Sequence, residues 1–261
     1  MPQPLLFGIV ALLGLAIGSF LNVVIYRVPR DESLVHPGSH CPQCGAAVRN
    51  RHNVPVLGWL MLRGRCADCH TPISVRYPLV EAGTALLFVA VAARFGFSWA
   101  LPAYLYLAAI SVALALIDLD VMRLPNAIVL PSYLVALVLL VPAALLGDGL
   151  APIIRGLVAA ALLWMFYRAL AHFGGMGGGD VKLAPLLGFY LGWLSWGSVA
   201  VGAFAGFMLG GLVGVVLMAT RLAGRKSRIP FGPYMLAGAF LAVFAATPIT
   251  DWYTALLTPT A

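Results

Sequence analysis

The sequence predicts an all-α polytopic membrane protein with about eight transmembrane helices and one small cytoplasmic loop domain. Of its 261 residues, 62% are hydrophobic and only 10% are charged, whereas charged residues make up about 25% of a soluble domain. The apolar residues gather in runs close to the roughly 20 residues that cross the hydrocarbon core of a bilayer. The net charge of +7 would also suit nucleic-acid binding, so the positions of the basic residues decide between the two classes.

Eight apolar segments follow one another along the chain. The stretch 181–220 is too long for one helix and short for two, and Gly188, Gly192 and the break at 193–197 divide it into a short helix, a tight turn and a second helix. The predicted segments are Leu5–Tyr26, Leu79–Phe95, Trp99–Ile117, Ala127–Leu146, Ile153–Ala171, Leu183–Leu194, Ser198–Ala219 and Pro233–Leu257.

The first segment is interpreted as a retained transmembrane helix spanning residues 1–26. It begins Met1-Pro2-Gln3-Pro4 without a positive n-region, and it is too long for the apolar region of a signal peptide. Its basic residues, Arg27 and Arg30, follow the segment, which places the N-terminus outside.

The distribution of basic residues supports eight helices. With the N-terminus outside, only Arg94 and Arg155 of the sixteen Lys and Arg residues fall on the outer side. Seven helices would place the cluster 221–228 outside, against the positive-inside rule. The charge excess is therefore explained by membrane topology, and no nucleic-acid partner is expected. The basic residues expected inside are Arg27, Arg30, Arg49, Arg51, Arg63, Arg65, Arg76, Arg123, Arg168, Lys182, Arg221, Arg225, Lys226 and Arg228.

All four cysteines lie in the one sizeable polar stretch, which is the loop between the first two helices. Cys41 and Cys44 form one Cys-x-x-Cys knuckle, and Cys66 and Cys69 form a second, with twenty-one residues between the pairs. This pattern is typical of a zinc ribbon in which four thiolates bind one ion and leave no site for water. The role expected for Zn²⁺ is therefore structural.

Two alternatives to this zinc site stay open. The four cysteines could be free thiols, although their paired spacing argues against it, and disulfides are disfavoured on a side that faces a reducing compartment. His40 and His70 flank the knuckles and could replace a cysteine, but solvated loop histidines are the simpler reading. A loop of about fifty residues with so few apolar side chains has too small a core to fold without a stabilising metal ion.

Asp118 and Asp180 carry the strongest functional signal, because each lies where a long apolar run meets the cytoplasmic interface. An acidic residue at a helix centre in a bilayer costs roughly 2.5–3.5 kcal/mol, so such residues default to functional hypotheses. Two carboxyl groups a few Å apart cannot both ionise, so one keeps a proton while the other takes one from water. Such a pair can activate water to attack an amide and protonate the leaving nitrogen.

The residues around the two aspartates have simpler alternatives. The glycine run before Asp180, with Gly177 and Gly179, permits close backbone approach to an extended peptide, but it could also serve helix packing. It satisfies no phosphate-loop pattern. Asp118 and Asp120 could form a divalent-metal pair, although a solvated Asp120 is the simpler reading. Glu81 could simply favour a helix N-terminus.

Across almost its whole length the chain resembles the type IV prepilin peptidases, the leader peptidase/N-methyltransferases. The blocks that carry the resemblance occur in the right order, and the cysteine knuckles with the Ser-x-Arg-Tyr-Pro block narrow it to the bifunctional bacterial branch. The blocks are Gly18–Pro29, the two knuckles, Ile73–Glu81, Ile117-Asp118 with Leu124-Pro125-Asn126, Gly177–Leu183, and Ile229–Pro233.

The resemblance implies an aspartic endopeptidase in the bacterial inner membrane, with Asp118 and Asp180 as its catalytic pair. Its substrates would be prepilins or type II secretion pseudopilins, cut after a glycine at the cytoplasmic face. It also implies N-methylation of the new N-terminus with S-adenosylmethionine. Gly64 and Glu81 are candidates for binding this cofactor by position only.

The resemblance also divides the chain into three parts. Residues 1–26 form the first helix, residues 27–78 form the zinc-binding loop domain associated with methyl transfer, and residues 79–261 form the peptidase domain of about seven helices. Lys182, Arg123 and Asn126 are expected to tune the aspartate pair or to orient the peptide. The rival classes are a membrane methyltransferase without peptidase activity, a zinc-anchored scaffold, and a transporter, whose carboxylates should lie nearer the midplane.

Overall fold

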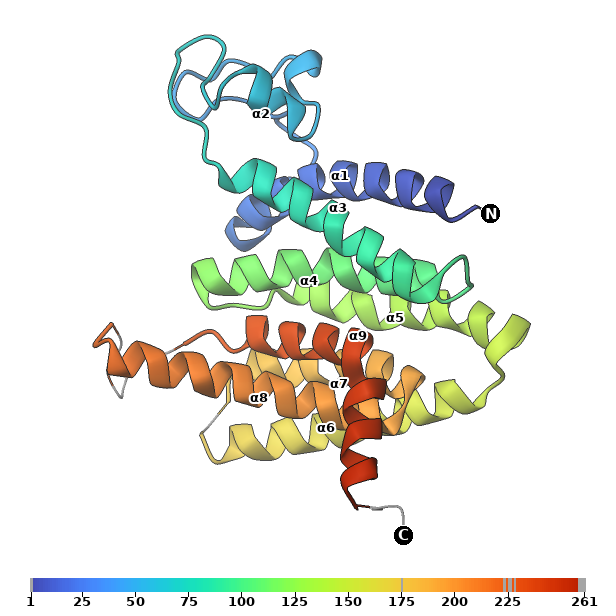
Figure 1. The fold of residues 1–261 in the computed structure, drawn as a ribbon. Helices are drawn as coiled ribbons and strands as arrows, with labels where there is room; N and C mark the ends of the chain where they lie inside the picture. Colours follow the sequence, from blue (N-terminus) through green and yellow to red (C-terminus); the bar gives the residue numbers. More distant parts are fainter. Residues whose placement is uncertain (1, 175, 223, 225–226, 228, 258–261) are drawn as a thin grey trace. The chain divides into compact units, whose positions relative to one another are not determined.

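The computed structural model describes residues 2–174, 176–222, 224, 227 and 229–257. Within these residues the chain is helical, and its extended backbone pairs only in two isolated bridges, His40 with Ala47 and Arg65 with Pro72. This confirms the predicted all-α fold (Figure 1). The helices are α1 (Gln3–Arg27), α2 (Leu57–Met61), α3 (Arg76–Phe95), α4 (Leu101–Val121), α5 (Asn126–Ala143), α6 (Ala151–His172), α7 (Gly178–Leu194), α8 (Trp196–Ala219) and α9 (Gly232–Leu257).

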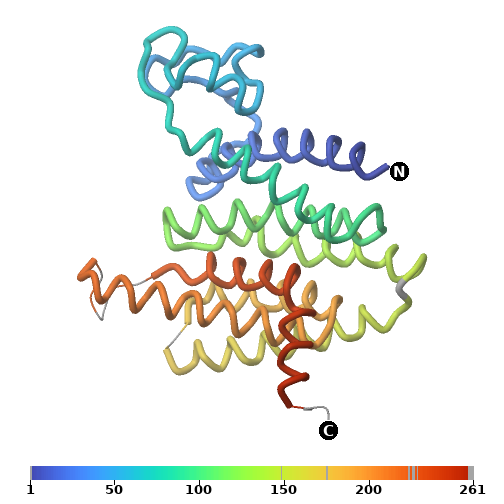
Figure 2. The backbone as a smooth tube through the Cα atoms, in the orientation of Figure 1, coloured from blue at the N-terminus to red at the C-terminus, as the bar shows by residue number. Residues whose placement is uncertain are grey.

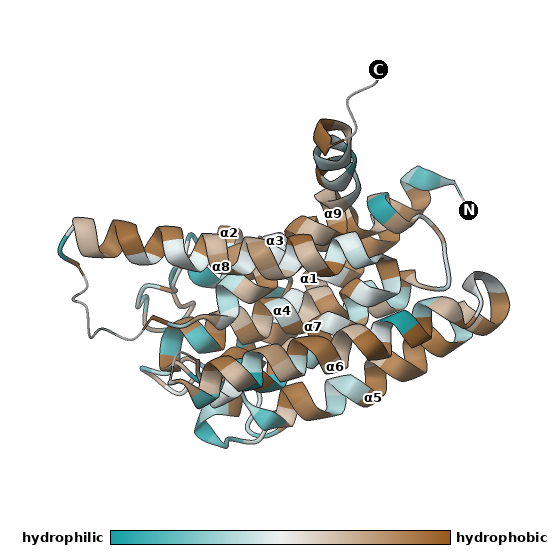
Figure 3. Ribbon diagram, turned by 90° about the horizontal axis from the view of Figure 1, so that it is seen from below, coloured by the Kyte–Doolittle hydropathy of each residue, from teal (hydrophilic) through white to brown (hydrophobic). Residues whose placement is uncertain are grey.

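Seven helices in the described part of the chain are long and apolar enough to cross a bilayer: α1, α3, α4, α5, α6, α8 and α9. Their outward faces carry large apolar side chains, such as Leu12, Leu134 and Phe204, which are 66–69% exposed. Figure 3 shows the apolar character running along the helices. So much exposed apolar surface is untenable in water and expected in lipid, and the protein is therefore a multi-pass membrane protein.

The predicted break after the short helix is confirmed. α7 has 17 residues and ends at Leu194, and Ser195 then adopts an extended conformation, with φ −170° and ψ 164°. The Ser195 hydroxyl oxygen accepts a hydrogen bond from the backbone N–H of Ser198 and so caps α8. Twelve of the 17 residues of α7 are buried; it is an interior helix.

The chain divides into two compact units, Met1–Ala113 and Leu114–Ala261. In the first unit, α1 and α3 pack tightly through two glycines of α1. A Cβ atom at Gly14 would lie 2.6 Å from the Cα atom of Ala85, and one at Gly18 would lie 2.7 Å from the Cα atom of Glu81. Only glycine permits this approach. The loop domain follows α1 and returns to the start of α3 (Figure 2).

In the second unit, glycines again bring helices into close contact. A Cβ atom at Gly188 of α7 would lie 2.8 Å from the carbonyl oxygen of Ala159 on α6, and one at Gly238 of α9 would lie 2.5 Å from the backbone nitrogen of Gly206 on α8. α6 with α7 and α8 with α9 therefore form two tightly packed antiparallel pairs (Figure 1).

Arg155 of α6 caps the C-terminal end of α7 with hydrogen bonds to three backbone carbonyls. Its Nε atom donates to the carbonyl oxygen of Gly192 at 2.5 Å, and one Nη atom donates to the carbonyls of Trp193 at 2.6 Å and Leu194 at 3.0 Å. The last carbonyls of a helix lack intrahelical partners and carry partial negative charge, so a guanidinium group there satisfies both needs. Arg155 is one of the two basic residues that the predicted topology has on the outer side, and these hydrogen bonds give it a structural role there.

Candidate active site

Asp118 lies in the last turn of α4, and its side chain is only 5% exposed. Its Oδ2 atom accepts a hydrogen bond of 3.0 Å from the backbone N–H of Gly232. Gly232 is the first residue of α9, so the carboxylate meets the N-terminal end of a helix, where backbone N–H groups lack intrahelical partners. Residues 114 positions apart in the chain thus build this half of the site.

Asp180 lies in the first turn of α7 and is 8% exposed. Its carboxylate accepts a hydrogen bond from the backbone N–H of Gly177, the N-cap residue. A side chain three residues after the N-cap commonly bonds back to that N–H in this way. A Cβ atom at Gly177 would lie 3.1 Å from Asp180 Oδ2, so this glycine leaves room for the carboxylate to fold back over the turn.

The structure brings the two predicted aspartates together. The side chains of Asp118 and Asp180 lie close enough to interact electrostatically. Leu124, in the turn after α4, lies close to the glycines next to both carboxylates: a Cβ atom at Gly179 would lie 3.2 Å from Leu124 Cβ, and one at Gly232 would lie 3.2 Å from Leu124 Cδ2. The turn after α4, the start of α7 and the start of α9 therefore converge on one buried site within the second unit.

Two side chains of α5 connect it to Lys182, two residues after Asp180 on α7. The ammonium group of Lys182 donates to Asn126 Oδ1 at 2.9 Å, and the hydroxyl of Tyr133 donates to the carbonyl oxygen of Lys182. The sequence indicates Lys182 and Asn126 but not Tyr133, because a single tyrosine in an apolar segment carries no local signal. The structure places Arg123 in the exposed turn before α5.

An aromatic cluster leads from α6 to the Asp118 end of the site. Tyr167 is 2% exposed, and its phenol interacts electrostatically with Asp180. Its ring lies 5.6 Å from that of Phe207, which lies 5.2 Å from that of Phe231, the residue before Gly232. Tyr167 was not predicted from the sequence, since a Tyr within an apolar helix carries no signal of its own.

Asp120 lies on the other side of α4 from the site. Its side chain is exposed while that of Asp118 is buried, as expected because residues two apart on a helix do not face each other. A divalent-metal pair of Asp118 and Asp120 is therefore disfavoured.

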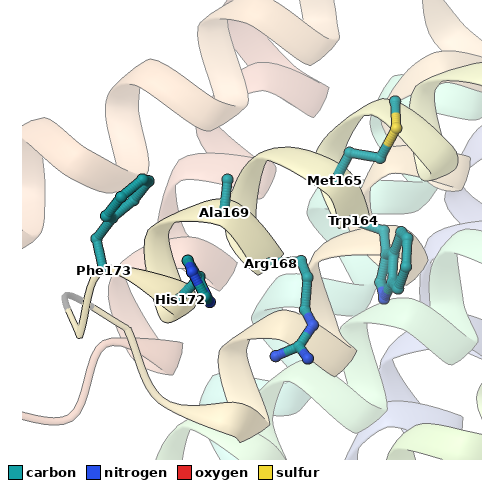
Figure 4. Close-up of a pocket in the computed structure, with 6 residues that line it drawn as sticks. All are labelled: Trp164, Met165, Arg168, Ala169, His172 and Phe173. Carbon is teal, nitrogen blue, oxygen red and sulfur yellow. The ribbon is translucent and has the colours of Figure 1, made fainter.

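An open groove of about 440 Å³ lies at the end of α6, lined by Trp164, Met165, Arg168, Ala169, His172 and Phe173. Figure 4 shows that its lining side chains come from α6 and the residue that follows it. Neither aspartate lines this groove, so the buried carboxyl pair is the better candidate for the chemistry.

The four cysteines form a second candidate site, in the first unit. Their Sγ atoms all lie within 4.8 Å of one another, and those of Cys41 and Cys69 are 3.7 Å apart. A tetrahedral ion with Zn–S bonds of about 2.3 Å separates its sulfurs by about 3.8 Å, so the arrangement fits zinc. The hydroxyl and backbone N–H of Thr71 lower the pKa of the Cys69 thiol to about 6, which favours its thiolate. The pKa of Cys44 is raised to about 12, because the hydrogen bond with the Ala46 backbone is outweighed by the Cys69 side chain and by burial.

The two residues proposed by position as cofactor ligands both contact the α2 segment. Gly64 has φ +67°, and a Cβ atom there would lie 2.7 Å from the indole ring of Trp59. Glu81 is 8% exposed, and its Oε2 atom accepts a hydrogen bond from the backbone N–H of Val56 at 2.6 Å. Both residues thus have structural partners within the loop domain.

Family models and individual relatives both match this chain over most of its length. Residues 12–95 match the bacterial peptidase A24 N-terminal domain, and residues 104–219 match the type IV leader peptidase family. A prepilin leader peptidase/N-methyltransferase of Aeromonas hydrophila is 39% identical over 95% of this chain and 94% of its own length. The proteins of that name from Pseudomonas aeruginosa and Neisseria gonorrhoeae are 34% and 35% identical over 93% and 94% of this chain and 91% and 92% of their own lengths. No solved structure matches.

Proposed function

The chain belongs to the type IV leader peptidase family, and on this premise we propose that it cleaves the basic leader from type IV prepilins or type II secretion pseudopilins and then N-methylates the new N-terminus. The relatives carry both activities in their name. The observation that supports the cleavage chemistry is the buried pair Asp118 and Asp180, each held by a backbone N–H at a helix start.

In the proposed mechanism the two aspartates share one proton. The ionised carboxyl group takes a proton from water, which attacks the carbonyl carbon of the scissile amide, and the protonated carboxyl group donates its proton to the leaving nitrogen. Gly232 and Gly177 occupy one lone-pair direction on each carboxylate and so hold its orientation. Such positioning is worth several orders of magnitude in rate when the reacting atoms are aligned.

Lys182 and Asn126 have a supporting role in this proposal. Their hydrogen bond, together with the one from the Tyr133 hydroxyl to the Lys182 carbonyl oxygen, connects the N-terminal part of α7 to α5. The flanking glycines make that part intrinsically mobile, so the external links keep Asp180 opposite Asp118. Arg123 is proposed to orient the peptide near the start of α5.

The proposed site faces the cytoplasm from the bacterial inner membrane, with the N-terminus in the periplasm. The positive-inside distribution of Lys and Arg supports this orientation. Arg225, Lys226 and Arg228 of the expected inner cluster lie outside the described residues. An interfacial site suits a substrate whose leader stays in water while its apolar helix stays in lipid, and its partners are therefore prepilins or pseudopilins and membrane lipid.

For the proposed methyl transfer, the loop domain must be folded. Zn²⁺ bound by Cys41, Cys44, Cys66 and Cys69 would stabilise that fold. Four thiolates fill a tetrahedral shell, so the ion would have no open position for a catalytic role. S-adenosylmethionine would supply a methyl group from its sulfonium to the free N-terminal amine. That amine must be neutral to attack, and it loses a proton as the new N–C bond forms.

The deciding experiment compares purified wild-type protein with Asp118→Asn and Asp180→Asn in lipid, using a prepilin as substrate. Asp120→Asn is the matched control, because it makes the same chemical change two residues away on the exposed side of α4. We expect both buried variants to lose leader cleavage while they keep zinc and methylate a pilin that has already been cleaved. Persistent cleavage in either variant would remove the aspartate pair from the mechanism.

A further inference from the structure

Glu81 is a buried carboxylate that the cleavage chemistry does not use. It lies on α3, where that helix packs closest to α1: a Cβ atom at Gly18 would lie 2.7 Å from the Cα atom of Glu81. The side chain is 8% exposed, and its Oε2 atom accepts a 2.6 Å hydrogen bond from the backbone N–H of Val56, 25 residues earlier. A buried carboxylate requires a compensating partner, and here the partner belongs to the loop domain.

Val56 has an unusual backbone conformation. Its φ is +61° and its ψ is −51°, and the N–H of Leu57 donates to the carbonyl oxygen of Pro55 at 2.6 Å across it. This is a γ-turn with positive φ, which is rare and strained, and strained further because the residue is β-branched rather than glycine. A strained backbone persists only where its surroundings hold it. The hydrogen bond to Glu81 is such a restraint.

The strained turn connects directly to the second cysteine knuckle. Val56 is the N-cap of α2, and Trp59 on α2 packs over Gly64 and donates its indole N–H to the carbonyl oxygen of Ile73 at 3.0 Å. Ile73 in turn donates its backbone N–H to the carbonyl oxygen of Gly64 at 2.7 Å. Residues 64 and 73 close the segment that carries Cys66 and Cys69. A continuous series of contacts therefore connects Glu81 on α3, through Val56 and Trp59, to the knuckle of Cys66 and Cys69.

We propose that Glu81 is a positioning residue that fastens the loop domain to α3 by holding the strained turn at Val56, and that it is not a ligand of the methyl donor. The expected effect on methyl transfer rests on the proposed function. The attachment of the loop domain to α3 does not, because it is a property of the fold. A carboxylate suits this task because a hydrogen bond to a charged acceptor is stronger than one to a neutral acceptor. The same arrangement requires a glycine at position 64, because its φ is positive and a Cβ atom there would collide with the ring of Trp59.

The test combines loss of the restraint with relief of the strain. Glu81→Leu removes the acceptor, Glu81→Gln keeps an amide oxygen in its place, and Val56→Gly removes the conformational strain. The double variant Glu81→Leu with Val56→Gly is the rescue. Val54→Gly is its control, because Val54 lies two residues away and has no positive φ. Three readouts are measured on full-length protein in lipid: the rate at which a chelator removes zinc, the rate of proteolysis within the loop, and methylation of a cleaved pilin.

We expect Glu81→Leu to accelerate zinc loss and loop proteolysis about tenfold and to lower methyl transfer about tenfold, with leader cleavage within twofold of wild type. Glu81→Gln should lie between it and wild type. Adding Val56→Gly should restore all three readouts to within about threefold of wild type, and adding Val54→Gly should not. If Glu81→Leu fails to fold, recovery of folded protein by Val56→Gly is the corresponding expectation.

The proposal is overturned if Glu81→Leu abolishes methyl transfer while zinc loss and proteolysis stay at the wild-type rate, or if Val56→Gly rescues no better than Val54→Gly. The first outcome would make Glu81 a ligand or a catalytic group. If wild-type protein showed no methyl transfer, the proposed function would fail, and zinc loss and proteolysis would still decide the role of Glu81.

Discussion

Gly232→Ala is the change that tests the Asp118 half of the site most directly. The backbone at Gly232 has no positive φ, so alanine is compatible with it, and only the added methyl group matters. That methyl carbon would lie 2.7 Å from Asp118 Oδ2 and 3.2 Å from Leu124 Cδ2. The carboxylate must therefore move away from the N–H that holds it.

The size of the effect follows from the contact that is lost. An ordinary contact of a Cβ atom is 3.4–4 Å, so the carboxylate moves by roughly 0.7 Å or rotates, and the 3.0 Å hydrogen bond from the Gly232 N–H is broken or distorted. A hydrogen bond to a charged group contributes about 1.5–3 kcal/mol. If the transition state loses that amount, kcat/KM for leader cleavage falls roughly tenfold to 150-fold.

The assay is leader cleavage by purified protein in lipid, with methylation of a cleaved pilin measured on the same preparation. Gly211→Ala on α8 is the matched control, since a Cβ atom there meets nothing within 4 Å, and it should cleave at the wild-type rate. Methyl transfer should be unaffected by either change. If Gly232→Ala cleaves as fast as Gly211→Ala, the N–H of Gly232 does not orient Asp118 and our account of the site is wrong.

Three further outcomes are expected. Tyr133→Phe deletes only the hydroxyl that donates to the Lys182 carbonyl oxygen. Because a neutral hydrogen bond contributes about 1 kcal/mol, kcat for cleavage should fall about fivefold in steady-state kinetics with KM unchanged. An unchanged kcat would refute the role of this hydrogen bond. Arg155→Met leaves three carbonyls at the end of α7 without their donor and should lower the Tm in a thermal-unfolding assay by several degrees, a result that an unaltered Tm would contradict. Cys66→Ser, or prolonged chelation, should abolish zinc binding in metal analysis and methyl transfer while leader cleavage persists, and loss of both activities together would argue against separate sites.

The sequence predicts the main candidate residues because their signals are local. An acidic residue at the end of an apolar run is costly, so Asp118 and Asp180 are conspicuous without any structure. Two Cys-x-x-Cys pairs likewise predict a ligand set, and the four Sγ atoms do gather. The helices follow from apolar runs of suitable length, and the break at Ser195 follows from the flanking glycines and tryptophans.

The remaining contacts depend on tertiary packing, which leaves no local pattern. Gly232 acts through its backbone N–H, a group that every residue except proline has, so its partnership with Asp118 is visible only once α9 is placed beside α4. Tyr133 acts through a hydroxyl in an otherwise apolar segment. Gly64 and Glu81 are candidate cofactor ligands by sequence position alone, and their contacts with Trp59 and Val56 depend on how the loop domain folds.

The length of α7 gives a reason why one catalytic candidate lies at its start. A helix of 17 residues is about 25 Å long, shorter than a hydrocarbon core of about 30 Å, so its ends need partners from the protein rather than from water. Arg155 supplies them at one end, and at the other the carboxylate of Asp180 accepts the N–H of Gly177. Asp180 therefore serves its own helix as well as the proposed chemistry. Asparagine keeps an acceptor for that N–H and removes only the titratable group, so Asp180→Asn separates the two roles, whereas Asp180→Ala would confound them.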